Sequence, residues 1–279
     1  MHPILARFTI GGEEVVLRAY STFYALAFVV ALALATVVAA RRGERWTRAL
    51  LVFGSSLIMG IVGARLLDLA VNWGYYSEDF GRVYALHFAG FSLYGGLILA
   101  PIAGFLLARA AGADLWRLAD SALPSMVAGI ALMRVGCYLN GCCYGTITSL
   151  PWGVTFPRGS SAWAQQILTG QTSVLAFGAS PRPVHPTEIY EIIAAFAFAL
   201  LALWLLVRHR STASRRTPDG VAALVFALGF TLFRLADDFL RADLPTYSRP
   251  DWFYPLLYAL ISAIIAALIV VRMRRVRRP

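Results

Sequence analysis

Seven apolar stretches, each long enough to cross a lipid bilayer as a helix, constrain this chain more than any other feature. A spanning helix needs roughly 20 consecutive apolar residues, and inside lipid it satisfies all of its own backbone hydrogen bonds. The composition agrees with this, since 59% of the 279 residues are hydrophobic and only 14% are charged. We therefore predict an all-α integral membrane protein with seven transmembrane helices. The stretches run approximately over residues 20–40, 50–72, 90–110, 118–139, 186–207, 219–240 and 253–271.

The basic residues are distributed unevenly among the connections between these helices. All 25 are arginine, and most lie in the connections after the first, third and fifth stretches and in the C-terminal tail. Because positively charged connections stay in the cytoplasm, we predict an outer N-terminus and a cytoplasmic C-terminus. This distribution explains the net charge of +10 without nucleic acid, which we do not expect as a partner. We predict one polytopic membrane domain over residues 1–279, with residues 141–185 forming a loop region on the outer side.

Charged residues within the apolar stretches are costly, at about 2.5–3.5 kcal/mol near the bilayer centre, so each needs an explanation. Arg65 and Asp68 are three residues apart and share a helix face, which suits either a structural ion pair or a functional role. Arg234, Asp238 and Arg241 form a narrow stripe along the sixth stretch. Two arginines around an acid suit a bound phosphate, although a cluster of side chains reaching to the interface explains the same pattern.

A further arginine, Arg134, lies at the outer end of the fourth stretch. Asn140, Gly141 and Gly145 follow it, and small residues allow a ligand or a second backbone segment to approach closely. The fifth stretch opens with His185, and helical spacing brings His185, Glu188 and Glu191 broadly to one side. The sequence thus predicts a site of membrane arginines facing the outer surface, suited to the phosphate of a lipid headgroup.

Several motifs, in order along the chain, are similar to one protein family. HPIL and LRAYSTFYAL open the chain, GARLLD lies in the second stretch, and FAGFSLYGGL begins the third. RVGCYLNGCCYG, PWGVTFP, HPTEIYE and FRLADDFLRAD follow. Together they resemble the bacterial phosphatidylglycerol–prolipoprotein diacylglyceryl transferases, and the similarity covers most of the chain.

This resemblance implies a seven-span enzyme of the bacterial plasma membrane, with its active site toward the outer leaflet. It would transfer diacylglyceryl from phosphatidylglycerol to the lipobox cysteine thiol of preprolipoprotein signal peptides, releasing glycerol phosphate, and it needs no cofactor. The implied partners are phosphatidylglycerol, these signal peptides and the bilayer. The catalytic residues that we expect are Arg134, Arg234, Tyr94 and His185. The expected substrate-binding residues are Tyr20, Arg65, Gly95, Gly96, Asn140, Gly141, Gly145, Glu191, Asp238 and Arg241.

The chain departs from the family pattern at four positions, one of which is Asp238 in place of a glutamate. Tyr94 replaces a histidine, Cys137 replaces an asparagine and Cys142 replaces a glutamate. A tyrosine with an ordinary pKa near 10 is a poor general base, so His185, Glu191 or a phosphate oxygen could accept the thiol proton instead.

Two other functions are compatible with these replacements. The first is a membrane thiol-disulfide oxidoreductase that uses Cys137, Cys142 and Cys143, and the second is a lipid-binding relative without catalytic activity. The oxidoreductase is disfavoured because such chemistry usually needs two exchanging cysteine pairs. The spacing C-x4-C-C lacks a clear set of four convergent ligands, so no metal site is expected.

Overall fold

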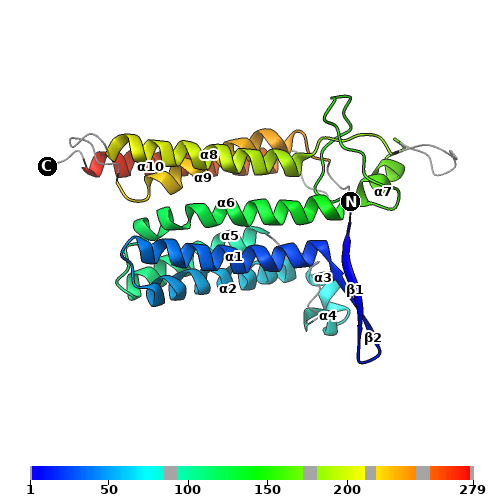
Figure 1. The fold of residues 1–279 in the computed structure, drawn as a ribbon, viewed down its shortest axis with the longest axis horizontal. Helices are drawn as coiled ribbons and strands as arrows, with labels where there is room; N and C mark the ends of the chain where they lie inside the picture. Colours follow the sequence, from blue (N-terminus) through cyan, green and yellow to red (C-terminus); the bar gives the residue numbers. More distant parts are fainter. Residues whose placement is uncertain (1, 85–92, 172–180, 211–217, 243–251, 277–279) are drawn as a thin grey trace. The chain divides into compact units, whose positions relative to one another are not determined.

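The computed structural model describes residues 2–84, 93–171, 181–210, 218–242 and 252–276 (Figure 1). Contacts divide the chain into two compact units, and each is described by itself. The first unit comprises residues 1–27 and 126–279, and the second comprises residues 28–125. Helices α1 (Ala19–Arg41) and α6 (Leu115–Asn140) each contribute one end to the first unit and the rest to the second.

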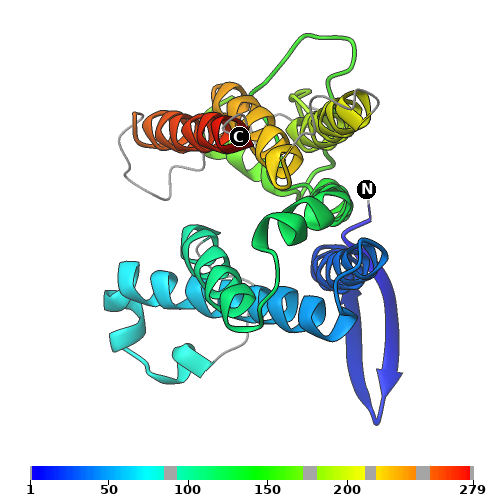
Figure 2. The ribbon, with the colours of Figure 1, turned by 90° about the vertical axis from the view of Figure 1, so that its left-hand side faces the viewer.

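Three long helices, α8 (Thr187–Arg210), α9 (Val221–Asp238) and α10 (Phe253–Val276), form much of the first unit. Helix α9 packs against both of the others (Figure 2). Gly229 of α9 lies against the ring of Phe198 on α8, where a Cβ atom would come within 2.7 Å of Cε1. Gly136 of α6 similarly lets α1 approach, because a Cβ atom there would lie 2.7 Å from Cβ of Phe23. Close contacts of this kind favour association between helices in lipid.

The first unit begins with a β-hairpin that the hydropathy pattern did not predict. Strands β1 (Ile4–Ile10) and β2 (Glu13–Arg18) pair antiparallel, with Ile10 opposite Glu13. Gly11 and Gly12 connect them with φ values of 60° and 93°, and a two-residue turn of this type requires positive φ at both positions. The Gly-Gly pair between two β-prone runs was the signal for this hairpin in the sequence.

The segment between α6 and α8 is folded around a small core of its own. It contains α7 (Ser161–Leu168), whose N-terminus is capped by the Ser160 hydroxyl accepting from the Trp163 amide at 3.2 Å. Tyr144, Phe156, Ala162 and Val184 pack together beneath it. Burial raises the pKa of the Tyr144 hydroxyl to about 12, and this hydroxyl donates to the Ser161 carbonyl at 3.0 Å. The predicted loop region is therefore an ordered part of the first unit over residues 141–171 and 181–186.

In the second unit, α2 (Trp46–Val71) packs closely on α5 (Leu93–Ala110). Glycines make this possible, because a Cβ atom on Gly63 would overlap the carbonyl oxygen of Gly95. A Cβ atom on Gly96 would lie 2.9 Å from the carbonyl oxygen of Gly60. Two short helices, α3 (Trp73–Ser77) and α4 (Gly81–Tyr84), follow α2. Gly95 and Gly96, predicted to bind substrate, thus pack α5 against α2.

Helices occur at all seven predicted apolar stretches, and their described boundaries lie within a few residues of the prediction. Within the described residues, five helical segments are long and apolar enough to cross a membrane: α1, α2, α6, residues 187–205 of α8 and residues 254–274 of α10. The described part of α5 is shorter, and α9 carries Arg234, Asp237 and Asp238 near its end. Few residues of α10 are fully buried in the protein, and Leu256, Leu260 and Ile264 are among its exposed apolar side chains.

Candidate active site

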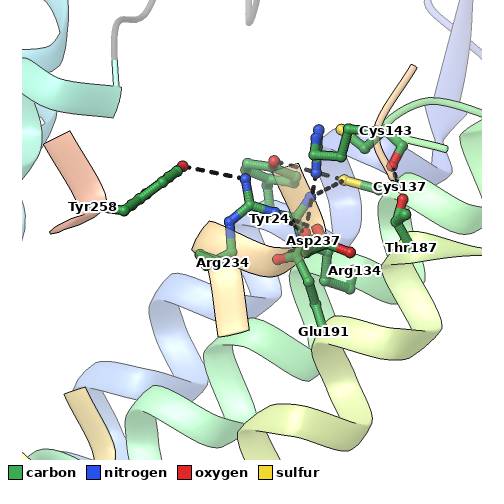
Figure 3. A network of polar contacts seen from close by, with 10 residues as sticks. Tyr24, Arg134, Cys137, Cys143, Thr187, Glu191, Arg234, Asp237 and Tyr258 are labelled. Atoms are coloured by element: carbon green, nitrogen blue, oxygen red, sulfur yellow. Dashed lines mark hydrogen bonds and ion pairs between the residues drawn. The ribbon is translucent and has the colours of Figure 1, made fainter. Parts of the chain in front are cut away.

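One buried carboxylate, that of Glu191, lies at the centre of a cluster of arginines in the first unit (Figure 3). Arg134 Nε donates to Glu191 Oε2 at 2.7 Å, and Arg234 Nη1 donates to Oε1 at 2.7 Å. Arg241 Nη1 donates to the same Oε1 atom at 3.1 Å. Charged hydrogen bonds of this length are about twice as strong as neutral ones, so Glu191 holds the three guanidinium groups at fixed positions.

Burial makes this pairing necessary. The Glu191 side chain is 2% exposed, and those of Arg134, Arg234 and Arg241 are 13%, 15% and 21% exposed. A charge withdrawn from water is tolerated only when it is paired and hydrogen-bonded. Asp237 adds a second carboxylate, accepting from Arg234 Nη1 at 2.7 Å. Glu191 and Asp237 together leave one of the three arginine charges unbalanced within this group of five side chains when all are ionised.

The arginines come from separate segments that the local sequence brings together. Arg134 lies near the end of α6, Glu191 one turn into α8, and Arg234 near the end of α9. Arg241 follows α9 and forms an isolated bridge with Gly145. The Gly145 amide donates to the His185 carbonyl at 2.8 Å, which ties the segment after α6 to the start of α8.

Glycine is required at position 145 because the backbone segments approach so closely. A Cβ atom there would lie 2.6 Å from the Leu240 carbonyl oxygen and 2.7 Å from Cβ of His185. The next amide, of Thr146, donates to that Leu240 carbonyl at 2.7 Å. Gly145, predicted to bind substrate, therefore positions the segment that carries Arg241.

Two partners of Arg234 were missed by reasoning from the sequence. Asp237, one turn away at i+3, pairs with Arg234 and was not among the expected residues. The binding role predicted for Asp238, at i+4 on the helical stripe, stays a prediction. Arg234 Nη2 also donates to the hydroxyl of Tyr258 on α10 at 3.3 Å, and its guanidinium carbon lies 5.8 Å from the centre of that ring. The spacing of Asp237 was a usable signal, but nothing near Tyr258 in the sequence indicated this contact.

Glu188 is buried one turn before Glu191, and its hydrogen bonding differs from that of Glu191. Neither of its carboxylate oxygens has a hydrogen-bond partner within the described part of the chain. The charged groups that act on it include Arg134 and Arg241. A buried carboxylate without a donor normally needs an explanation, and a place in a reactive site is one.

The three cysteines gather beside this arginine cluster. Cys137 is buried in α6, and its sulfur lies 3.9 Å from Arg134 Nη1 and 3.7 Å from the Tyr24 hydroxyl. The Tyr24 ring packs against the Tyr20 ring at an angle of 32°, with ring centres 4.3 Å apart. Cys142 and Cys143 follow α6, and the sulfur atoms of all three cysteines lie within 4.8 Å of one another. Tyr20, predicted to bind substrate, thus lies next to a residue that contacts a thiol.

His185 lies in the segment that leads into α8. Its Nδ1 atom is 3.2 Å from the Tyr190 hydroxyl, which also accepts from Trp152 Nε1 at 2.8 Å. Asn140 and Gly141 lie where α6 ends, and Gly141 has a φ of 71° that suits glycine. The catalytic role predicted for His185 and the binding roles predicted for Asn140 and Gly141 stay predictions.

Arg65 belongs to the second unit, and its donors are used there. It donates to the carbonyls of Arg82 and Val83, both at 3.0 Å, and lies 3.9 Å from Asp68. The Tyr76 hydroxyl donates to Asp68 at 2.6 Å, and this bond raises the pKa of Tyr76. These contacts agree with the structural interpretation of the Arg65–Asp68 pair. The side chain of Tyr94, predicted to be catalytic, lies outside the described residues.

Comparison with known proteins identifies the family. The model of the prolipoprotein diacylglyceryl transferase family matches residues 6–275. The chain belongs to this family. A phosphatidylglycerol–prolipoprotein diacylglyceryl transferase of Geobacter sulfurreducens is 31% identical over 229 residues, covering 80% of this chain and 77% of that protein. The enzymes of the same name from Nitratidesulfovibrio vulgaris (strain DP4) and Pasteurella multocida are each 29% identical, over 227 and 232 residues. The two alignments cover 80% and 81% of this chain, and 76% and 75% of the two relatives, respectively. Family membership and the apolar helices together indicate a multi-pass membrane protein.

Proposed function

We propose that this protein transfers the diacylglyceryl group of phosphatidylglycerol to a cysteine thiol of prolipoproteins. The observation that carries the proposal is the group of three arginines held on the single buried carboxylate of Glu191, within a chain of this family. Phosphatidylglycerol presents one anionic phosphate diester, and a guanidinium group binds phosphate through two parallel hydrogen bonds.

Catalysis follows from what the arginines do to the leaving phosphate. The thiol sulfur forms a bond to the terminal carbon of the diacylglyceryl group as the carbon–oxygen bond to phosphate breaks. Glycerol phosphate then leaves with one more negative charge than the diester phosphate had. Because Glu191 fixes Arg134, Arg234 and Arg241 before the reaction, their donors stabilise this charge without reorganising. Losing one such donor typically costs 10²–10³ in rate.

The thiol of the acceptor must also lose a proton, since the thiolate is the nucleophile. Glu191 is poorly placed to accept it, because its oxygens already accept from three arginines. We propose Glu188 as the acceptor, since it is buried close to the charges of Arg134 and Arg241 and has no hydrogen bond of its own in the described structure. Tyr94 and His185 keep the catalytic roles that the resemblance implies, and with Glu188 as the proton acceptor they would act by orienting the substrates.

The proposed arrangement in the membrane has seven spans, with α5 and α9 added to the five helices that are long and apolar enough over their described residues. The arginine distribution supports a cytoplasmic C-terminus and an outer N-terminus, in the plasma membrane of a bacterium. The ends of α6 and α9 that carry the cluster then lie at the outer leaflet, where lipobox cysteines of signal peptides would meet lipid headgroups. A C-terminal reporter that is active only in the cytoplasm tests this topology, and an inactive reporter in correctly inserted protein would overturn it.

The two alternatives are less well supported. A thiol-disulfide oxidoreductase is not favoured by the family, and the three cysteines are free thiols in the structure. A lipid-binding relative without activity would keep the phosphate site but transfer nothing. Headgroup-dependent transfer to a thiol separates this case from the enzyme.

The test is incubation of the purified protein, in detergent, with labelled phosphatidylglycerol and a lipobox peptide. We expect the peptide to gain mass as a diacylglyceryl thioether. Arg134→Ala and Arg234→Ala should each abolish this product while the protein still inserts into membranes. Arg7→Ala is the matched control, because Arg7 forms an exposed ion pair with Glu14 on the hairpin. Full turnover by both cluster variants would show that these arginines do not bind the reacting phosphate.

A further inference from the structure

Cys137, Cys142 and Cys143 form a cluster of thiols that the transfer reaction does not use, because the substrate supplies its own nucleophilic thiol. Their sulfur atoms lie within 4.8 Å of one another, and all three are free cysteines. Three sulfurs around one metal ion, each about 2.3 Å from it, would be roughly 4 Å apart. The observed spacing therefore needs only small side-chain adjustments to surround an ion.

The backbone brings the three cysteines together by means of two residues with positive φ angles. Gly141 has a φ of 71°, and Cys143 has a φ of 68°, the one positive value at a non-glycine residue in the described chain. Such a conformation costs of order 1–3 kcal/mol and persists where the surroundings impose it. The Cys142 amide donates to the Cys137 carbonyl at 3.1 Å, and the Thr187 hydroxyl donates to the Cys143 carbonyl at 2.6 Å. The turn that presents the thiols is thus anchored to α6 and to α8.

The surroundings of the cluster suit bound thiolates. Cys137 is fully buried, and its sulfur lies 3.9 Å from Arg134 Nη1 and 3.7 Å from the Tyr24 hydroxyl (Figure 3). Donors around a ligating sulfur stabilise its charge and orient it, as outer ligands do in known metal sites. The charges of both Arg134 and Arg241 also favour the thiolate form of Cys143.

We propose that Cys137, Cys142 and Cys143 bind one thiophilic metal ion, best matched by Cu(I) in threefold sulfur coordination. Soft thiolate ligands select Cu(I) and Zn(II) among biological metals. A closed zinc site uses four protein ligands, and the described residues bring three side chains of this kind together. The spacing of the cysteines in the sequence predicted no metal site. It does not reveal that the sulfur atom at the end of α6 and those of the following turn lie close together. This proposal goes beyond diacylglyceryl transfer and does not depend on it.

Metal binding is measured on the full-length, reduced protein in detergent under anaerobic conditions. Cu(I) is titrated against a coloured Cu(I) chelator, and Zn(II) is titrated separately. We expect one Cu(I) ion per chain with release of thiol protons, and a loss of affinity of at least tenfold in each of Cys137→Ser, Cys142→Ser and Cys143→Ser. Met126→Leu is the matched control, because it removes an exposed thioether of α6 and should bind as the unmodified protein does.

Three results of the titrations would overturn the proposal. The first is Cu(I) binding that persists in the triple cysteine variant, and the second is binding unchanged by any one of the single variants. The third is Zn(II) binding more tightly than Cu(I), which contradicts the preference for Cu(I). Alkylation of the unmodified protein gives a test without variants, since one Cu(I) ion should protect all three thiols from labelling. Labelling of all three thiols while Cu(I) is bound would count against the site. A mass lower by two hydrogens, which indicates a disulfide in the isolated protein, would also count against it.

Discussion

Replacing Glu191 by glutamine removes the carboxylate that holds the arginine cluster together while keeping the size of the side chain. Glutamine has one oxygen that accepts hydrogen bonds, whereas Glu191 now accepts from Arg134, Arg234 and Arg241 through two oxygens. The amide group of glutamine would face a guanidinium group as a second donor. We therefore expect Glu191→Gln to lower both stability and activity.

The size of the effect follows from burial. The Glu191 side chain is 2% exposed, so solvent does not replace the lost charge. Removing one partner from a buried ion pair costs about 3–5 kcal/mol. At roughly 2–4 °C for each kcal/mol in a protein of 150–250 residues, the midpoint of thermal unfolding should fall by about 10 °C. Displacing the arginines by about 1 Å should reduce the transfer rate about 10²-fold or more.

Thermal unfolding in detergent and transfer to a lipobox peptide measure the two effects. Glu14→Gln is the matched control, because Glu14 pairs with Arg7 at 3.1 Å but both side chains are more than half exposed. An exposed pair of this kind contributes less than about 1 kcal/mol. If Glu191→Gln and Glu14→Gln unfolded at the same temperature, Glu191 would not organise the cluster as described here.

Two further substitutions separate function from packing. Glu188→Gln should reduce transfer by about 10²–10⁴-fold if Glu188 accepts the thiol proton, yet leave the unfolding temperature unchanged or higher, because neither of its oxygens has a hydrogen-bond partner in the described structure. Undiminished turnover by this variant would rule out that role. Gly63→Ala should destabilise the second unit by about 1–3 kcal/mol, since its Cβ atom would overlap the Gly95 carbonyl. Gly54→Ala on the same helix meets nothing within 4 Å and should be neutral or stabilising, so equal unfolding temperatures for the two variants would contradict the packing argument.

Much of the helical architecture was predictable because the length of an apolar run is a local property. The predicted stretch 118–139 corresponds to α6 at Leu115–Asn140, and 219–240 corresponds to α9 at Val221–Asp238. The N-terminal hairpin was missed, because only long apolar stretches were used to predict elements and the Gly11–Gly12 turn was not considered. Short strands in which apolar and polar residues alternate are not detected by a search for long apolar segments.

The residues of the candidate site could be predicted from the sequence, but which arginine pairs with which carboxylate could not. Arg134, Arg234, Arg241 and Glu191 were recognised from charges in apolar surroundings and from motifs shared with a family. That Glu191 is the common acceptor depends on how α6, α8 and α9 approach one another. Tyr258 joins the group from α10, and no local pattern identifies that contact.

The sequence by itself determined which segments form helices, which family the chain resembles and which arginines are expected to bind phosphate. Hydrophobic length, charge and ordered motifs are all properties of short stretches, so they can be read without knowing the fold. Only the tertiary structure decided that Asp237 pairs with Arg234, that Gly95 packs against α2, and that three thiols converge after α6. Those outcomes depend on distances of a few ångströms between atoms of different turns and segments, and neither helical periodicity nor residue spacing specifies such distances.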